Sequence, residues 1–386
     1  MEQNTDAIAK LILSDGTEFS GLSLGSKGTV IGEVVFTTGM TGYLETLTDP
    51  SYYGQIVTQT FPLVGNYGIN EDDRESKKAW LSGYIVRECC EEPSNFRSCG
   101  KLSDWLKSQG VVAIKGIDTR SLTKKIRETG VMNGAITTEK NIDKAALLKD
   151  IRNFTIKDAV KTTSTTQIKN YADGPLESLK ATLPSNTPCN FNFKICLMNF
   201  GAKRNIARSL IRRGCELLVV PYNTTAEQIK KLNPDGIMLS NGPGDPMENK
   251  EVIKNLKEIG KLNVPIFGIC LGHQLLALAN GAKTEKLKYG HRGANQPVVD
   301  VLLDRTLVTT QNHGYAVVAD SIKEDVGYIS HYNANDGTCE GIAYKNIPAF
   351  TVQFHPEAWA GPLDTDYLFD RFFRLIKDNK NGERRV

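Results

Sequence analysis

The chain has 386 residues, of which 40% are hydrophobic and 24% charged, and its formal net charge is +3. This composition is ordinary for a globular protein with room for two domains, and the interleaved charges argue against nucleic acid or an anionic membrane as a partner. No apolar stretch approaches the roughly 20 residues that span a bilayer, and the opening residues lack the apolar core of a signal peptide. We therefore expect a cytoplasmic protein.

The first part of the chain, residues 1–155, is predicted to be a domain of mixed α/β structure. A hairpin over 10–19 turns at Asp15-Gly16, and Asp118 or Thr119 begins a helix that Gly130 ends. Further strands are predicted over 32–38, 55–60 and 81–87, and further helices over 102–109 and 143–154. Residues 156–192 are predicted to be a linker, because they are rich in Thr, Ser, Asn and Pro and show weak periodicity.

From residue 193 to 386 apolar strands alternate with helices. This alternation predicts an α/β fold with an open, mostly parallel sheet that carries helices on both faces. The strands are expected at 194–198, 216–220, 236–239 and 265–269, the helices at 203–213, 225–232, 248–259 and 271–280, and a last helix at 363–377. In such sheets the ligand binds beyond the carboxyl ends of the strands.

The eight cysteines include no C-x-x-C pair, which excludes a zinc ribbon or a thioredoxin motif. In a cytoplasmic protein we expect free thiols. Cys89, Cys90 and Cys99 lie close in sequence but have no histidine nearby, so we expect no metal site in this chain.

Cys270 stands at a predicted turn between a strand and a helix, in the stretch GICLGHQ of residues 268–274. Gly268 and Gly272 flank it where a tight turn leaves little room for side chains, as in the nucleophile elbow of hydrolases. The positive end of the helix dipole favours the thiolate, which is the reactive form. Cys270 is therefore a candidate nucleophile.

His355 and Glu357 can complete a triad with this thiol. They follow the apolar run 349–354, which predicts a second buried strand. Residues two apart on an extended segment point the same way, so Glu357 can orient the ring of His355. An imidazole beside the thiol can take its proton.

The loop SNGPGDP, residues 240–246, follows the predicted strand 236–239. This strand is expected to end at the same edge of the sheet as the strands that precede Cys270 and His355. Attack on an amide creates an oxyanion, which needs donors fixed in place beforehand. The backbone N–H groups of Gly242 and of Leu271 are candidate donors, and Gly244 would let a substrate approach the backbone closely.

Taken together, SNGPGDP, GICLGHQ and HPE, in this chain order, resemble the motifs of class I glutamine amidotransferases. The resemblance extends to a narrower family, the small subunits of carbamoyl phosphate synthetase, and covers nearly the whole chain. Its other motifs are GEVVFTTGMTGYLETLTDPSYYGQIV (32–57), GNYGIN (65–70), GIDTRSLTKKIRETG (116–130), NFGAKRNIARSL (199–210) and QNHGYAV (311–317). The N-terminal motifs belong to a domain that other class I amidotransferases lack.

The resemblance implies hydrolysis of the glutamine side-chain amide through a γ-glutamyl thioester. Cys270 would be the nucleophile, His355 the general base and acid, and Glu357 the orienting carboxylate. The implied glutamine-binding residues are Ser51, Gly242, Gly244, Leu271, Gln274, Asn312, Gly314 and Tyr315, with His313 in a supporting place. The chain departs from the family pattern at Asn199, where an acidic residue is usual, and at Trp359, a bulky residue close to the triad.

The resemblance also implies a large synthetase subunit that accepts ammonia and makes carbamoyl phosphate from bicarbonate and ATP, in arginine and pyrimidine biosynthesis. The chain has no Walker-type phosphate loop, so we expect no cofactor in it and place ATP, Mg²⁺ and K⁺ on that subunit. The pair would be a heterodimer able to form higher oligomers. Two alternatives stay open: the glutaminase component of another amidotransferase, such as that for anthranilate or GMP synthesis, or a non-catalytic glutamine-binding regulatory subunit.

Overall fold

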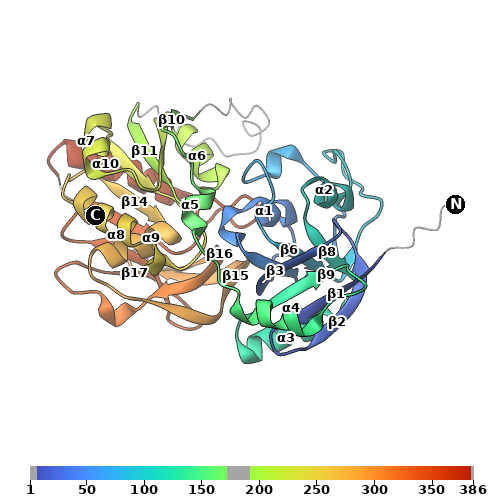
Figure 1. Cartoon of the computed structure of the whole chain (residues 1–386). Helices are drawn as coiled ribbons and strands as arrows, with labels where there is room; N and C mark the ends of the chain where they lie inside the picture. The colour runs from blue at the N-terminus through green and yellow to red at the C-terminus, as the bar shows by residue number, and fades with distance from the viewer. Residues whose placement is uncertain (1–6, 172–191, 384–386) are drawn as a thin grey trace.

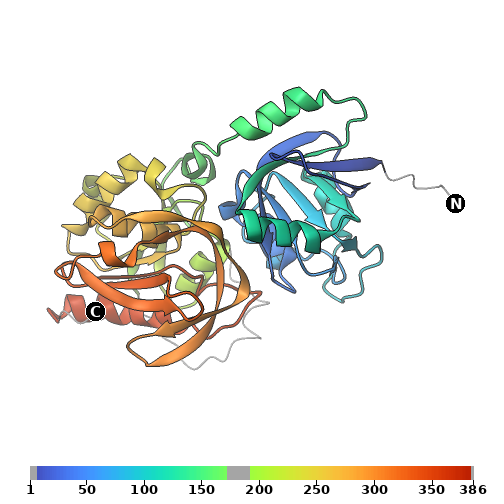
Figure 2. The ribbon, with the colours of Figure 1, turned by 90° about the horizontal axis from the view of Figure 1, so that it is seen from below.

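The structure is a computed structural model that describes residues 7–171 and 192–383. These residues form two lobes that lie side by side, the first built on a barrel and the second on a large sheet (Figure 1). A view turned by 90° shows the same two lobes, with the chain passing from one to the other through green segments (Figure 2). Within the described ranges no helix is long and apolar enough to cross a bilayer.

The N-terminal lobe is a barrel, which the sequence analysis did not predict. Among the described residues its strands close in the order β1-β2-β8-β6-β4-β3-β9. Closure depends on pairings between distant segments, because β9 pairs antiparallel with both β1 and β3. The strands are β1 (Ile8–Leu13), β2 (Glu18–Ser23), β3 (Thr29–Thr37), β4 (Gln55–Gln59), β6 (Gly83–Val86), β8 (Val112–Lys115) and β9 (Met132–Thr137), and the short pair β5 (Leu63–Val64) and β7 (Glu88–Cys89) lies outside the barrel.

The local signals in this lobe are confirmed. The predicted hairpin forms, with β1 and β2 antiparallel and the Asp15 carboxylate accepting a hydrogen bond from the Thr17 N–H at 2.9 Å. Asp118 caps its helix by accepting from the Ser121 N–H, and Gly130 ends it. The helices are α1 (Tyr43–Thr48), α2 (Leu102–Ser108), α3 (Thr119–Thr129) and α4 (Lys144–Asn153), with short 3₁₀ turns η1 (Pro50–Tyr52) and η2 (Glu71–Asp73).

The C-terminal lobe has the predicted α/β architecture around a sheet of order β10-β12-β11-β13-β14-β19-β18-β16-β15-β17. The parallel pairings run from β12 to β19, and the strands beyond them pair antiparallel. The strands are β10 (Lys169–Asn170), β11 (Lys194–Asn199), β12 (Glu216–Pro221), β13 (Gly236–Leu239), β14 (Ile266–Ile269), β15 (Thr284–Asp300), β16 (Arg305–Val317), β17 (Gly327–Asn333), β18 (Cys339–Tyr344) and β19 (Ala349–Val352).

Helices cover both faces of the parallel part, because successive residues of a strand point to opposite faces. On β13, Ile237 and Leu239 pack into one apolar cluster, whereas Met238 packs into the other. The first cluster includes residues of α7 (Ala226–Leu232), α8 (Lys250–Gly260) and α9 (Leu271–Ala279). The second includes residues of α6 (Arg204–Ile211) and α10 (Tyr367–Lys380).

Part of the predicted linker is structured. Residues 159–163 form α5 (Ala159–Thr163), and β10 pairs antiparallel with β12 and so extends the C-terminal sheet. The sequence analysis missed β10 because a strand of two residues is too short to show a hydrophobic period. Residues 172–191 of the predicted linker, with Cys189, lie outside the described residues. The seven cysteines that the structure describes are free thiols.

Glu75 joins the two lobes through a buried carboxylate. It accepts hydrogen bonds from the backbone N–H and side-chain Nδ2 of Asn205 at 3.1 and 2.9 Å, and its own carbonyl accepts from the Arg204 N–H at 2.8 Å. Burial raises the pKa of Glu75 to about 7, although the nearby Lys203 ammonium acts to lower it. The lobe junction therefore contains a titratable group.

The raised pKa predicts a stability that declines with rising pH. The folded chain keeps the Glu75 proton up to about pH 7, whereas the unfolded chain loses it near the ordinary pKa of about 4.5. The contribution to the free energy of unfolding is therefore fully present below pH 4.5 and lost as pH rises through 7, by at most about 3 kcal/mol. Urea unfolding from pH 4.5 to 8 should show a flatter profile for Glu75→Gln than for the wild type.

The matched control is Glu71→Gln, which removes an exposed glutamate from the same region of the barrel. It should leave the wild-type pH profile unchanged. Parallel profiles for Glu75→Gln and the wild type would contradict the prediction.

Candidate active site

Cys270 lies in the turn between β14 and α9, with a backbone φ of 52° that side-chain-bearing residues rarely adopt. The helix approaches the sheet so closely that a Cβ at Gly272 would lie 2.5 Å from the Leu239 carbonyl oxygen. A Cβ at Gly268 would lie 2.8 Å from the Thr351 side chain. The two glycines are thus required by close packing, and the strained turn holds the thiol at the carboxyl end of the strand.

Strand pairing brings the predicted general base to the same edge. β14 and β19 are parallel neighbours with Ile269 opposite Val352, and the Cys270 N–H donates to the Val352 carbonyl at 2.9 Å. His355 follows shortly after β19, where its N–H donates to the Thr310 carbonyl at 2.9 Å. Cys270 and His355, far apart in sequence, therefore lie at the same sheet edge, because each follows the end of one of two adjacent strands.

The His355 ring is oriented by Glu357, as the sequence analysis predicted from their spacing. The Nδ1 atom lies 2.7 Å from the Glu357 carboxylate, and both side chains are fully buried. Burial acts to raise the pKa of Glu357, but the charges of His355 and Lys203 outweigh it and lower that pKa to about 2. The carboxylate is ionised, and Nε2 of the ring has no hydrogen-bond partner among the described residues. That nitrogen is free to exchange a proton with a reacting group.

Lys203 is a charged residue of the site that the sequence analysis missed. Its ammonium is 7% exposed and lies 3.3 Å from the Glu357 carboxylate and 3.8 Å from that of Asp49, in the N-terminal lobe. Asp49 also accepts from the Asn312 side-chain amide at 3.1 Å. Both residues stand inside motifs quoted above, NFGAKRNIARSL and DPSY, but only their meeting in space reveals an ion network.

The Cys270 thiol is protonated at rest. Burial raises its pKa and the nearby carboxylates of Asp49 and Glu357 raise it further, whereas Lys203 and the Leu271 backbone act to lower it. The helix dipole cited in the sequence analysis is therefore outweighed by desolvation. The reaction therefore requires a general base that takes the thiol proton as substrate binds, and His355 is the candidate for this role.

A cavity of about 360 Å³ opens on the sulfur atom and is lined by both lobes. Cys270 lines it together with seven of the eight predicted glutamine-binding residues and His313: Ser51, Gly242, Gly244, Gln274, Asn312, Gly314 and Tyr315. The eighth, Leu271, is buried beside Gly242, where an added Cβ would meet its side chain at 2.8 Å. The structure thus gathers around one cavity residues that are widely separated in sequence.

Several lining side chains are held in place by protein partners. The Gln274 amide donates to the Tyr315 carbonyl at 2.8 Å, and the Ser51 hydroxyl accepts from the Asn241 amide at 2.8 Å. The Ser51 N–H is held by Asp49 at 2.8 Å. These contacts fix polar groups before any ligand arrives, which reduces the cost of ordering them on binding.

The two departures from the family pattern have different surroundings. Asn199 uses its side-chain oxygen to accept from the N–H groups of Gly201 and Ala202 at 2.9 and 2.8 Å, which an aspartate could do equally well. Trp359 lines a separate cavity of about 70 Å³ with Asp49 and Lys203, and the Arg212 guanidinium lies over its ring. The first departure keeps the local turn, and the second places a large ring near the ion network.

Comparison with known proteins agrees with this geometry. Residues 11–136 match the family model described as "Carbamoyl-phosphate synthase small chain, CPSase domain", and residues 196–375 match that of "Glutamine amidotransferase class-I". The carbamoyl phosphate synthase small chain of Fusobacterium nucleatum is 49% identical, over 96% of this chain and 98% of its own length. Those of Bacillus thuringiensis and Listeria monocytogenes are 49% and 48% identical, over 97% of this chain and 98% of theirs.

The chain belongs to the carbamoyl phosphate synthase small-chain family. Its C-terminal lobe contains the class I glutamine amidotransferase domain, so the chain is a glutamine-hydrolysing enzyme component. The match at 11–136 falls on the barrel, and the match at 196–375 falls on the C-terminal lobe. The family resemblance that the sequence motifs indicated is confirmed.

The ion network predicts unequal effects of two interlobe lysines. Lys203→Met leaves Glu357 and Asp49 buried without their cation, which should cost about 3–5 kcal/mol of unfolding free energy. It should also lower kcat for glutamine hydrolysis at least tenfold, because the orienting carboxylate loses one of the two charged neighbours that favour its ionised form. Urea unfolding and a glutaminase assay measure both effects.

Lys286→Met is the control for stability, because the Lys286 side chain is 47% exposed although it also pairs across the lobes, with Glu33 at 2.5 Å. Because the cation of this pair is open to solvent, the pair contributes up to about 1 kcal/mol. Equal destabilisation by the two substitutions would refute the account of the buried network.

Proposed function

We propose that Cys270, His355 and Glu357 hydrolyse the side-chain amide of glutamine. His355 Nε2 takes the thiol proton as the sulfur attacks the amide carbon, and a tetrahedral oxyanion forms. Protonation of the nitrogen by His355 releases ammonia and leaves a γ-glutamyl thioester. Water, deprotonated by the same ring, then attacks the thioester and releases glutamate, returning the proton to the sulfur. The observation that carries this proposal is that ionised Glu357 lies against Nδ1 of a buried His355 ring, whose Nε2 has no hydrogen-bond partner in residues 7–171 and 192–383.

Substrate binding is assigned to the cavity on Cys270. Gly242 and Leu271 would supply backbone N–H groups for the oxyanion, each worth about 3 kcal/mol of transition-state stabilisation. Gly244 has a φ of 88°, where a side chain would be strained, and so allows close approach to the backbone. Ser51, Gln274, Asn312, Gly314 and Tyr315 would bind the polar groups of glutamine, with His313 supporting them.

The ammonia would pass to a large carbamoyl phosphate synthase subunit. There it would react with bicarbonate and ATP to give carbamoyl phosphate for arginine and pyrimidine biosynthesis. We assign ATP, Mg²⁺ and K⁺ to that subunit and propose a heterodimer, able to form higher oligomers, as the working enzyme. The match to the small-chain family over nearly the full length supports this assignment and disfavours a glutaminase of another pathway. A non-catalytic regulatory subunit is disfavoured by the complete triad.

The proposal predicts that Cys270→Ser uncouples the two nitrogen sources. In the assembled enzyme, glutamine-dependent carbamoyl phosphate synthesis should fall by at least 10³-fold, because the hydroxyl is a far weaker nucleophile than the thiolate. Synthesis from added ammonium should stay within about twofold of the wild type, since its chemistry lies on the partner.

Cys99→Ser is the matched control, because Cys99 is a free, exposed thiol of the barrel lobe. It should keep both activities. Retained glutamine-dependent synthesis in Cys270→Ser would overturn the assignment of the nucleophile.

A further inference from the structure

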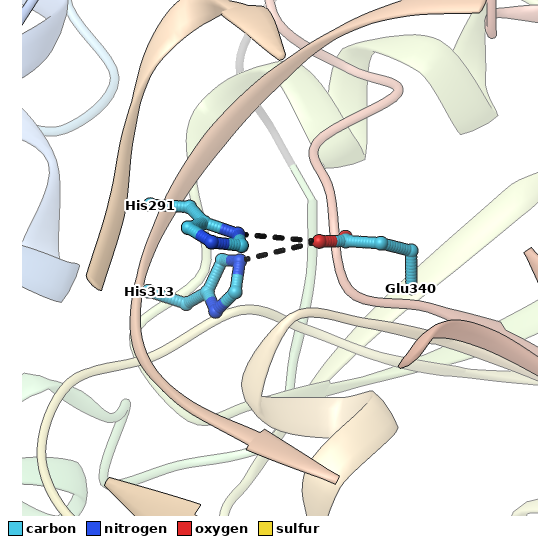
Figure 3. A group of neighbouring side chains, drawn as sticks. All are labelled: His291, His313 and Glu340. Atoms are coloured by element: carbon cyan, nitrogen blue, oxygen red, sulfur yellow. Dashed lines mark ion pairs between the residues drawn. The ribbon is translucent and has the colours of Figure 1, made fainter. Parts of the chain in front are cut away.

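Three side chains from three strands converge behind the segment that lines the glutamine cavity. His291 on β15 and His313 on β16 both point at Glu340 on β18 (Figure 3). One Glu340 carboxylate oxygen, Oε1, lies 3.4 Å from His291 Nδ1 and 3.8 Å from His313 Nε2. Glu340 is fully buried and His313 nearly so, whereas His291 is 12% exposed and gives the group a side open to solvent.

The outer nitrogen of each ring is engaged by an acceptor. His291 Nε2 lies 2.9 Å from the Asp336 carboxylate, and His313 Nδ1 lies 2.9 Å from the Tyr315 carbonyl. In the tautomers that carry their protons on the outer nitrogens, the neutral rings donate hydrogen bonds to these oxygens. The inner nitrogens then turn lone pairs toward the Glu340 carboxylate. Histidines that bind metals are oriented in this way, with the second ring nitrogen donating to a carboxylate or carbonyl.

Gln311 adds a fourth lone pair to the group. Its Nε2 donates to the Thr309 hydroxyl at 3.2 Å, and that hydroxyl in turn donates to the Gln296 carbonyl at 2.9 Å. The orientation of the amide is thereby fixed, so its Oε1 oxygen faces His313 Nε2 at 3.2 Å. One donor near this group is the Asn333 amide, at 3.5 Å from both His291 Nδ1 and Glu340 Oε1. Acceptors that converge on a buried carboxylate favour a positive charge among them, either a metal ion or a proton on His291.

We propose that His291, His313 and Glu340 bind a divalent transition-metal ion of the zinc class, with Gln311 Oε1 at the fourth position. In a tetrahedral site with bonds of about 2.0–2.2 Å, the ligand atoms lie about 3.4 Å apart. The candidate ligand atoms of His291, His313 and Glu340 all lie within 4.8 Å of one another, so the widest separation has to close by up to about 1.4 Å to complete the geometry. Asp336 and the Tyr315 carbonyl act as outer partners that orient the two rings.

The ion is structural in this arrangement, because four protein atoms fill its coordination. It ties β15 and β16 to β18 directly behind Asn312 and Gly314, which line the glutamine cavity. The sequence analysis expected no metal in this chain, since spacing rules detect ligands that lie close in sequence. Here the three ligands come from separate strands, and only sheet pairing brings them together.

Metal titration of the full-length chain tests the proposal. After dialysis against a chelator, the wild type should bind one equivalent of Zn²⁺ by calorimetry and unfold at a higher temperature with Zn²⁺ present. Glu340→Gln and His291→Asn should abolish this binding, and Asp336→Asn should weaken it about 10–100-fold. Glu285→Gln, an exposed carboxylate on the same strand β15, is the control and should bind as the wild type does.

Cobalt distinguishes this site from adventitious binding by the free thiols. Co²⁺ should give the visible bands of a tetrahedral ion without the near-ultraviolet thiolate band, because the proposed ligands are nitrogen and oxygen. Circular dichroism checks the fold of each variant, and the half-exposed Asp336 offers a mild substitution should the buried ones misfold. Absence of stoichiometric binding to the wild type, equal binding by Asp336→Asn and the wild type, or a thiolate spectrum would overturn the proposal. Absence of binding would mean that protons, and no metal ion, neutralise the buried Glu340 carboxylate.

Discussion

The parallel pairing of β14 with β19 determines where the chemistry takes place. Cys270 follows the first strand and His355 the second, and the register sets Ile269 opposite Val352. Because side chains alternate between faces along a strand, a shift of one residue would turn the His355 segment away from the sulfur. The strained turn at Cys270 and the carboxylate of Glu357 refine an arrangement that strand order has already imposed.

The barrel lobe supplies part of the site. Ser51 lines the cavity from η1, whereas Asp49, which precedes η1, pairs with Lys203. Lys203 thus balances two buried carboxylates that belong to different lobes. Burying the charge of Glu357 is costly unless a cation accompanies it, and docking of the lobes places the Asp49 carboxylate beside that same cation. Glutamine hydrolysis is in this way linked physically to a lobe junction that amidotransferases without the barrel do not have.

Sequence patterns predicted the features that depend on short stretches of chain. The hairpin at Asp15-Gly16, the alternation of strands and helices, and the glycines beside Cys270 follow from local sterics and periodicity. Closure of the barrel was missed because β9 must find β1 and β3 far away in sequence. The pairing of Lys203 with Glu357 and the group around Glu340 were missed for the same reason, since charges and ligands that meet across strands leave no spacing to detect.

The proposed function depends on one thiol, held at the end of β14, for its covalent step. The most direct measurement is labelling with a glutamine analogue that alkylates cysteine, followed by peptide mass spectrometry. The account predicts one label per chain on Cys270, protection by glutamine, and loss of glutaminase activity in proportion to labelling. Full inactivation with the label on a different residue, or full activity with Cys270 labelled, would contradict it.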